Sequence, residues 1–335
     1  MRHLVLLALC AAIVPAQAEK PKPTKSRAPR LGIKTPGIQI PIESLKPELV
    51  FPTAATPAWL AFTDTVLLPN SEAHTLVRID PKAKEAKFGE PIAGVQKPCA
   101  GMVNAFNSLW TGDCADGALV RIDPKTAKVT AKIASGIGSA AIALAATADS
   151  VWLLTDKRGT LSRIDPVQNE VVAELRVPAD CTSLTFGETA LWVACPADSR
   201  VLRIDPLTNL VDKSIEVSAR PEAIAIGEAS VWVLCAKEGK LDRIDPKTNK
   251  VAKTIELGAP AAGGSLAIGE NSVWVSIPGF PVTRIDPATD KVVQQFYGEG
   301  GGLIRVGLSF VWLVNAEAGT LWKLDPRRIA ATLAE

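Results

Sequence analysis

Three carboxylates in the first half of the chain have the chemistry of a divalent-metal site. Asp113, Asp116 and Asp156 lie in polar sequence that follows apolar runs. Carboxylate oxygens are the ligands that Mg²⁺ and Ca²⁺ prefer, so these residues would suit a metal-dependent lyase or hydrolase. No Cys-x-x-Cys pair or Cys/His cluster indicates zinc. The sequence predicts no cofactor, with a divalent metal (Mg²⁺ or Ca²⁺) as the alternative.

A second group of residues suits ligand binding without catalysis. An indole face and a guanidinium in one cavity would hold an anionic or aromatic ligand, and Trp59 and Arg305 are the candidates for this role. Four further residues are expected on the loops around the same site: His74, Arg158, Arg220 and Glu222. The alternatives are simple packing for Trp59 and Arg305 and simple solvation for the loop residues. None of these residues forms a nucleophile–base pair.

A repeat sets the elements that must position these residues. Arg-Ile-Asp-Pro occurs six times, and Lys323-Leu-Asp-Pro326 is a seventh copy; the steps from Asp to Asp are 43, 42, 40, 40, 41 and 39 residues. Each unit holds four short β-favouring runs separated by Gly, Pro, Asn or Asp turns. The repeat therefore predicts an all-β, seven-bladed β-propeller of four-stranded antiparallel blades. The shared motif is expected to be structural, with Asp and Pro forming a turn and Arg tying neighbouring blades.

A tryptophan marks the second strand of six repeats, 12 or 13 residues before the Asp, and Leu67 takes its place in the first repeat. Counting back from these positions places small residues on the innermost strands. Trp59 in the first repeat and Arg305 in the last break that pattern. The ring must also close by joining the chain ends. Residues 48–51 are the favoured closing strand, and residues 329–333 are the alternative.

The cysteines follow the same spacing. Cys99 and Cys114, and likewise Cys181 and Cys195, lie at the start of a first strand and the end of the second. Because these strands are antiparallel neighbours, the two ends meet, and we expect two disulfides of about 3 kcal/mol each. Cys235 holds the same second-strand position without a partner, so we expect a free, buried thiol.

The N-terminus has the layout of a secretory signal peptide over residues 1–18. An apolar run over 4–14 precedes the small-residue cleavage sequence Ala16-Gln-Ala18. We expect a periplasmic or secreted protein without a transmembrane segment, a flexible Pro/Lys-rich linker over 19–48 and the propeller over 49–335. The chain carries 37 Lys and Arg against 35 Asp and Glu, a balance that gives no electrostatic case for binding nucleic acid.

The repeat resembles the YVTN repeat of YncE-like bacterial propellers. Val231-Trp-Val233 matches the aromatic second strand, and residues 241–258 match the signature third and fourth strands. This resemblance covers residues 49–335 and implies the propeller fold. The repeat style is also similar to virginiamycin B lyase, which implies a magnesium-dependent enzyme that opens a macrocyclic antibiotic with histidine and glutamate. His74, in the first repeat, is the only histidine after residue 18.

Three functions follow as expectations. The first is an exported, monomeric, non-enzymatic propeller that binds a small molecule or an envelope protein at its loop face and channel mouth. A metal-dependent lyase or hydrolase of the virginiamycin B lyase type is the second. An envelope assembly scaffold, using the blade edges and the basic linker, is the third.

Overall fold

The repeated Arg-Ile-Asp-Pro motif ends the third strand of each blade in a tight turn. In the fifth blade, Asp245 accepts hydrogen bonds from the Lys247 backbone N–H (2.8 Å) and the Thr248 hydroxyl (3.0 Å). Asn249 then takes a left-handed φ of 56°, which Asn tolerates better than most residues. The same carboxylate-to-backbone contact two residues on occurs at Asp80, Asp123, Asp165, Asp205, Asp286 and Asp325. The expected turn role of the motif is confirmed.

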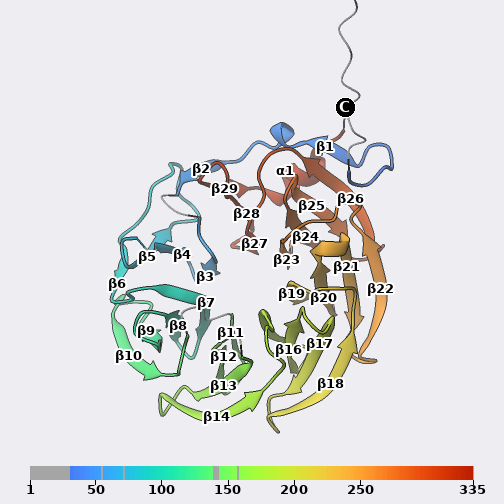
Figure 1. Ribbon diagram of the computed structural model, residues 1–335. Coiled ribbons are helices and arrows are strands. Elements are labelled where there is room, and N and C mark those ends of the chain that lie inside the picture. Colours follow the sequence, from blue (N-terminus) through green and yellow to red (C-terminus); the bar gives the residue numbers. More distant parts are fainter. Residues whose placement is uncertain (1–30, 54–55, 71, 139–142, 157, 335) are drawn as a thin grey trace, which may run out of the picture. The chain divides into compact units, whose positions relative to one another are not determined.

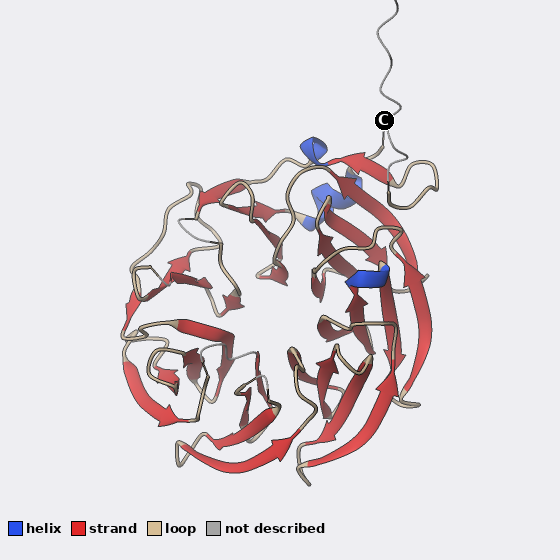
Figure 2. Cartoon of the chain, viewed as in Figure 1, coloured by secondary structure: helices blue, strands red, loops and turns tan. Residues whose placement is uncertain are grey.

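Seven blades surround a central axis within the unit formed by residues 32–335 (Figures 1 and 2). The computed structural model describes residues 31–53, 56–70, 72–138, 143–156 and 158–334. The expected signal peptide and residues 19–30 of the expected linker lie outside the described residues. In the described part of the chain, no helix is long and apolar enough to cross a membrane.

In the first six blades, successive strands of the chain lie progressively farther from the axis (Figure 1). Blades one and two contain β3 (Ala61–Phe62), β4 (Val66–Asn70), β5 (Thr75–Ile79), β6 (Ile92–Ala93), β7 (Pro98–Ala105), β8 (Ser108–Asp113), β9 (Ala118–Ile122) and β10 (Val129–Ala134). Blades three and four contain β11 (Ala143–Ala146), β12 (Val151–Leu154), β13 (Thr160–Asp165), β14 (Glu170–Arg176), β15 (Ser183–Gly187), β16 (Ala190–Cys195), β17 (Arg200–Asp205) and β18 (Leu210–Glu216).

The second half of the ring follows the same plan. Blades five and six contain β19 (Ala223–Gly227), β20 (Ser230–Cys235), β21 (Lys240–Asp245), β22 (Lys250–Glu256), β23 (Ser265–Gly269), β24 (Ser272–Ile277), β25 (Phe280–Asp286) and β26 (Lys291–Tyr297). Blade seven contains β27 (Ile304–Gly307), β28 (Phe310–Asn315) and β29 (Thr320–Leu324). Two 3₁₀ turns, η1 (Ile42–Ser44) and η2 (Ala236–Glu238), and one helix, α1 (Pro326–Ala331), complete the elements.

The N-terminal segment closes the ring. Strand β2 (Leu49–Pro52) pairs antiparallel with β29 as the fourth strand of blade seven, with Leu49 opposite Lys323. The favoured closing strand is thus confirmed. The C-terminal residues offered as the alternative instead begin within α1, which Asp325 caps by accepting the Arg327 backbone N–H.

Residues 32–48 differ from the flexible linker expected over 19–48. Strand β1 (Gln39–Pro41) adds to the outer edge of blade six, in parallel with β26, and the Gly32 N–H donates to the Gly258 carbonyl at 2.8 Å. Ile40, Ile42 and Leu45 are buried. The Pro and Lys content of this segment conceals a short apolar sequence, and burial of that sequence against the blade edge offsets the entropy lost on ordering it.

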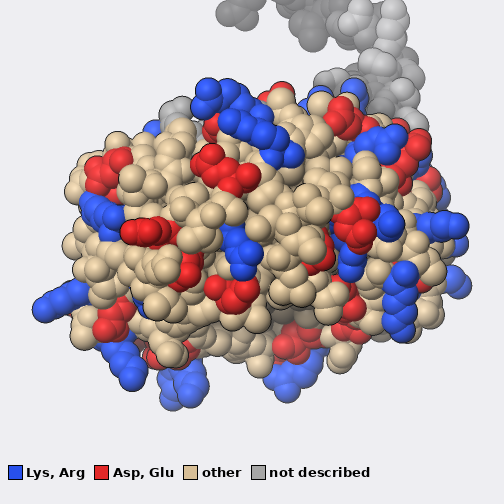
Figure 3. All heavy atoms as spheres, turned by 90° about the horizontal axis from the view of Figure 1, so that it is seen from below, with Lys and Arg blue, Asp and Glu red and all other residues tan. Residues whose placement is uncertain are grey.

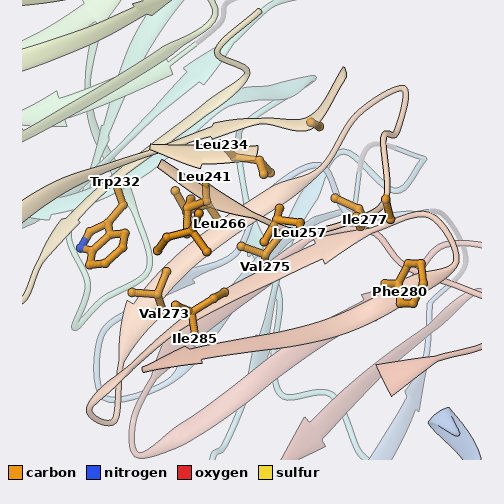
Figure 4. Close-up of a cluster of buried hydrophobic side chains, with 13 residues drawn as sticks. Trp232, Leu234, Leu241, Leu257, Leu266, Val273, Val275, Ile277, Phe280 and Ile285 are labelled. Atoms are coloured by element: carbon orange, nitrogen blue, oxygen red, sulfur yellow. The ribbon is translucent and has the colours of Figure 1, made fainter. Parts of the chain in front are cut away.

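Apolar cores lie between successive blades. Trp232 of blade five packs with Leu266, Val273 and Ile285 of blade six, as Figure 4 shows. The corresponding tryptophans of the other blades are also fully buried: Trp110, Trp152, Trp192, Trp274 and Trp312. Each large ring buried at these interfaces adds apolar area that holds neighbouring blades together.

The motif arginine stacks over this tryptophan and reaches the next blade. The guanidinium carbon of Arg243 lies 5.3 Å from the centre of the Trp232 ring. The corresponding distances for Arg121, Arg163 and Arg203 are 4.9, 5.6 and 5.9 Å. The Nη1 of Arg243 donates to the Pro287 carbonyl (3.1 Å) and the Asp290 carboxylate (2.9 Å) of blade six. Arg121 makes the equivalent bonds from blade two to Pro166 and Asn169 of blade three. The expected role of the arginine as a tie between blades is confirmed for these pairs.

Charges of both signs cover the side of the propeller seen in Figure 3, where Lys and Arg alternate with Asp and Glu. This distribution agrees with the near balance of basic and acidic residues in the sequence. The turns, tryptophans and arginines that the blades share are structural, and a site is expected where the blades differ.

Candidate functional site

The innermost strands enclose a central cavity of about 850 Å³, to which all seven blades contribute. Its wall is mostly small or apolar, because the inner strands carry residues such as Gly101, Ala143 and Ala223 at corresponding positions. Among the described residues that line this cavity, only Glu222 and Arg305 are charged. The described part of the cavity wall is thus uncharged apart from one carboxylate, Glu222, and one guanidinium, Arg305.

Arg305 is the second residue of β27 and lies deep in the body, half-exposed to the cavity. Its Nη1 donates to the Ser265 hydroxyl (2.9 Å) and the Ile304 carbonyl (2.8 Å). Neither Nε nor Nη2 has a hydrogen-bond partner in the described part of the chain, and no carboxylate there lies at ion-pair distance. Burial lowers the pKa of Arg305 to about 10, so the side chain remains cationic at neutral pH.

Glu222 precedes β19 at the mouth of the cavity. Its backbone N–H donates to the Leu234 carbonyl at 2.8 Å, which fixes its place at the end of the inner strand. Its half-buried carboxylate accepts no hydrogen bond from a described residue. Burial raises the pKa of Glu222, and the positive charge of Arg220 opposes this effect in part. Glu222 is therefore a poorly solvated carboxylate without a fixed partner.

Trp59 lines the cavity but serves mainly as packing. It is 6% exposed and belongs to the core between blades one and two, with Leu67, Leu109 and Ile122. This is the interface at which Leu67 replaces the second-strand tryptophan, so Trp59 supplies the large ring from the segment just before β3 instead. Its buried Nε1–H has no acceptor among the described residues. The structure thus places Trp59 and Arg305 at one cavity, with Trp59 largely withdrawn into its wall.

Both expected disulfides are present. Cys99 bonds to Cys114 and Cys181 to Cys195, with Cα–Cα distances of 6.0 and 4.0 Å. Each ties the chain entering a blade to the end of the second strand, at the same end of the propeller as Glu222. Cys235 is free and buried, as expected. Burial raises the pKa of its thiol, so the thiolate needed of a nucleophile is strongly disfavoured.

The three carboxylates offered as metal ligands are bound by their own loops. Asp113 is buried and accepts the backbone N–H groups of Gln96 (2.8 Å), Lys97 (2.9 Å) and Ala115 (3.2 Å). Burial raises the pKa of Asp113, but these hydrogen bonds outweigh it and the pKa is lowered. This carboxylate therefore joins the backbone at Gln96 and Lys97 to its own loop.

Asp116 and Asp156 have basic partners nearby. Asp116 pairs with Lys132, and Asp156 pairs with Arg158 at 2.9 Å. Burial raises the pKa of Asp156, whereas the Thr160 N–H and Arg158 lower it and prevail. Among the residues that the structure describes, no group of three or more His, Cys, Asp or Glu side chains is arranged to hold a metal. The structure does not bring the three carboxylates together at one point.

The remaining loop residues lie apart from the cavity wall. His74 is exposed and its Nδ1 contacts the Gln96 carbonyl, while Arg158 is engaged with Asp156. Arg220 is exposed with a left-handed φ of 57°, two residues before Glu222. Of the four loop candidates, Glu222 alone lines the cavity, and Arg220 acts on it through its charge.

Ser265 is the site residue that sequence reasoning missed. It occupies a position on the inner strands at which the sequence pattern indicates only a small residue. Its hydroxyl holds the Arg305 guanidinium and also accepts the Ile304 backbone N–H at 3.1 Å. A hydroxyl among Gly and Ala at equivalent positions was the available signal, although Ser183 has the same signal without an arginine beside it.

Solved structures with the same fold include two lyases. One is described as a streptogramin B lyase; it has a TM-score of 0.70 and 15% identity over 82% of this chain and 96% of that chain. The other is virginiamycin B lyase from Staphylococcus aureus, with a TM-score of 0.69 and 15% identity over 82% and 98% of the two chains. No family model matches the sequence, and no curated protein matches it. At this level of identity the likeness concerns the fold, and the chain is a seven-bladed β-propeller similar in architecture to these lyases.

Proposed function

We propose that this protein is an exported binding protein whose central cavity takes up a small anionic molecule, with Arg305 as the anion-binding residue. One observation carries the proposal: Arg305 is the only cation among the described cavity-lining residues, and two of its nitrogens have no partner in the described part of the chain. A guanidinium held from one side by Ser265 presents its open donors to the cavity. Charge-assisted hydrogen bonds from such donors to a carboxylate are stronger than neutral ones.

The fixed walls of the cavity support ligand binding. Mobile parts would have to order on binding, at a cost in affinity, whereas disulfides at the rim and hydrogen-bonded inner strands preorganise the site. The N-terminal signal sequence supports export, and two disulfides fit an oxidising compartment. N-terminal sequencing of the exported protein is expected to find Glu19 as the first residue.

Calorimetric titration with hexanoate tests the anion site. We expect saturable binding to the wild-type protein and loss of that binding in Arg305→Met, which keeps most of the side-chain volume. Arg200→Met is the matched control, because Arg200 is exposed on β17 and its Nη1 contacts the Ser214 hydroxyl. Binding that survives in Arg305→Met, or that is lost equally in Arg200→Met, would contradict the proposal.

A lyase or hydrolase is the second candidate. It is supported by the placement of Glu222, whose raised pKa suits a general acid or base, in the same cavity as a guanidinium that would stabilise negative charge. The fold shared with virginiamycin B lyase adds to this support. Incubation with virginiamycin B, with and without Mg²⁺, followed by mass spectrometry, tests it. A ring-opened product that disappears in Glu222→Gln would favour the enzyme over the binding protein.

A further inference from the structure

The two charges of the cavity meet the same blade from opposite sides. Glu222 comes from blade five, and its Oε2 would lie 3.8 Å from a Cβ placed on Gly263. Arg305 comes from blade seven and bonds to Ser265. Gly263 and Ser265 are two residues apart on the chain that enters β23, a span of at most about 7 Å. Both residues therefore lie beside blade six, Glu222 at the mouth of the cavity and Arg305 deeper in it. We call these two places the acidic level and the basic level.

The two side chains do not neutralise each other. No ion pair joins Glu222 to Arg305, and in the described part of the chain neither has another partner of opposite charge within 4.0 Å. Arg220 acts on Glu222 only from an exposed position, where solvent screens its charge. Each charge therefore carries an uncompensated desolvation cost, which a ligand of opposite charge would relieve.

We propose, resting on the anion site described above, that the cavity recognises a bipolar small molecule with an anionic group at one end and an ammonium at the other. The anionic group binds Arg305 at the deeper level, and the ammonium binds Glu222 at the mouth. A ligand in the reverse orientation would set like charges against each other, which costs affinity. The small and apolar residues between the two levels suit an aliphatic or otherwise uncharged middle section.

The arrangement predicts that a simple anion is an incomplete ligand. A carboxylate without an ammonium would satisfy Arg305 and leave Glu222 desolvated, with no gain at the mouth. An amine without a carboxylate would leave Arg305 in the same condition. A molecule with both groups makes two charge-assisted contacts within one rigid site, and the second contact requires no further loss of translational freedom.

Pairs of ω-amino acids and their parent carboxylates test the proposal. The probes are aminobutanoate, aminopentanoate and aminohexanoate, each with its amine at the far end, beside butanoate, pentanoate and hexanoate. Because the pairs differ only in the ammonium, their affinity ratio at each length measures its contribution. We expect at least one amino acid to bind the wild-type protein about tenfold or more tightly than its carboxylate, the range of one charged hydrogen bond.

Two variants assign the effect to the two levels. Glu222→Gln is expected to retain carboxylate binding and to reduce the affinity ratio to about one, whereas Arg305→Met is expected to lose both members of every pair. If hexanoate binds through Arg305 but no amino acid binds more tightly than its carboxylate, the bipolar ligand is refuted and the anion site stands. An ammonium advantage that persists in Glu222→Gln also refutes it. Absence of binding by all six probes would overturn both proposals.

Discussion

Arg243 in the outer turns and Arg305 in the central cavity show two uses of the same side chain. Arg243 donates to the Ser230 hydroxyl, the Pro287 carbonyl and the Asp290 carboxylate, and its plane lies over Trp232. Within the described ranges, Arg305 has one engaged nitrogen and no carboxylate at ion-pair distance. Arg243, at a position that the blades share, is held by protein groups through two of its nitrogens, whereas Arg305, at a position that breaks the repeat, keeps two nitrogens without a partner among the described residues. The predictions below test how far this distinction holds.

Trp59 is the first test, because it breaks the repeat but packs like a repeated residue. Trp59→Ala is expected to lower the free energy of unfolding by about 3–5 kcal/mol, the usual cost of removing a buried tryptophan. The reason is the cavity left between blades one and two, where no second-strand tryptophan is present. Urea unfolding followed by circular dichroism measures the loss.

Trp322→Ala is the matched control, since Trp322 is only partly buried in β29 and should cost less. The hexanoate affinity of folded Trp59→Ala is expected to stay near that of the wild-type protein. A variant that kept its stability and lost hexanoate binding would move Trp59 from the structural group to the site.

The cysteines at equivalent second-strand positions give the next largest difference. Replacing Cys181 and Cys195 together by Ala removes a disulfide that spans 14 residues and is expected to cost about 3 kcal/mol in the chain-entropy model. Cys235→Ala removes a buried thiol whose Sγ donates to the Ser218 carbonyl at 3.1 Å, and about 1 kcal/mol is expected. Unfolding midpoints under non-reducing conditions compare the two. Equal losses would show that the disulfide adds nothing beyond packing.

Arg243→Met tests the saturated arginine directly. It removes two hydrogen bonds from blade five to blade six, a third to Ser230 within blade five and the stacking contact with Trp232, so we expect a loss of about 1–3 kcal/mol in the free energy of unfolding. Thermal and urea unfolding measure it.

Arg305→Met is the contrasting variant. Removing a cation whose burial lowers its pKa to about 10 relieves a desolvation cost, and this offsets the hydrogen bonds lost to Ser265 and Ile304. We expect stability within about 1 kcal/mol of the wild-type value, or above it. A loss as large as that of Arg243→Met would place Arg305 among the structural arginines.

The sequence reveals repeating features far better than unique ones. The period of the Arg-Ile-Asp-Pro motif locates the blades, the tryptophans and both disulfides, because seven copies of one pattern constrain each other. The ordered structure of residues 32–48 could not be predicted in this way. Its buried residues Ile40, Ile42 and Leu45 have no equivalent in the repeats, and the sequence around them is rich in Pro and Lys.

The candidate site shows the same division. Departure from the repeat identifies Arg305, but it cannot distinguish Trp59 as packing, because that depends on how the residues before β3 meet blade two in the folded protein. Asp113, Asp116 and Asp156 look like metal ligands by residue type. Their hydrogen-bond partners, which decide the matter, are backbone N–H groups and basic side chains that become neighbours only in the folded loops.

Glu222→Gln provides the smallest effect and concerns the acid of the cavity. Because burial raises the pKa of Glu222 above its usual value of 4.5, its ionised form is less favourable in the folded protein than in the unfolded chain. The folded state therefore binds the proton more tightly, and the contribution of Glu222 to stability falls as pH rises from 4.5 through the raised pKa.

Glu222→Gln should be more stable than the wild-type protein at neutral pH, and this advantage should vanish as pH falls below 4.5. Urea midpoints of both proteins across this pH range measure the difference. An advantage that is constant with pH would mean that Gln gains by packing, and a loss of stability at neutral pH would mean that Glu222 has a stabilising partner, in contrast to the unpaired acid inferred for the cavity mouth.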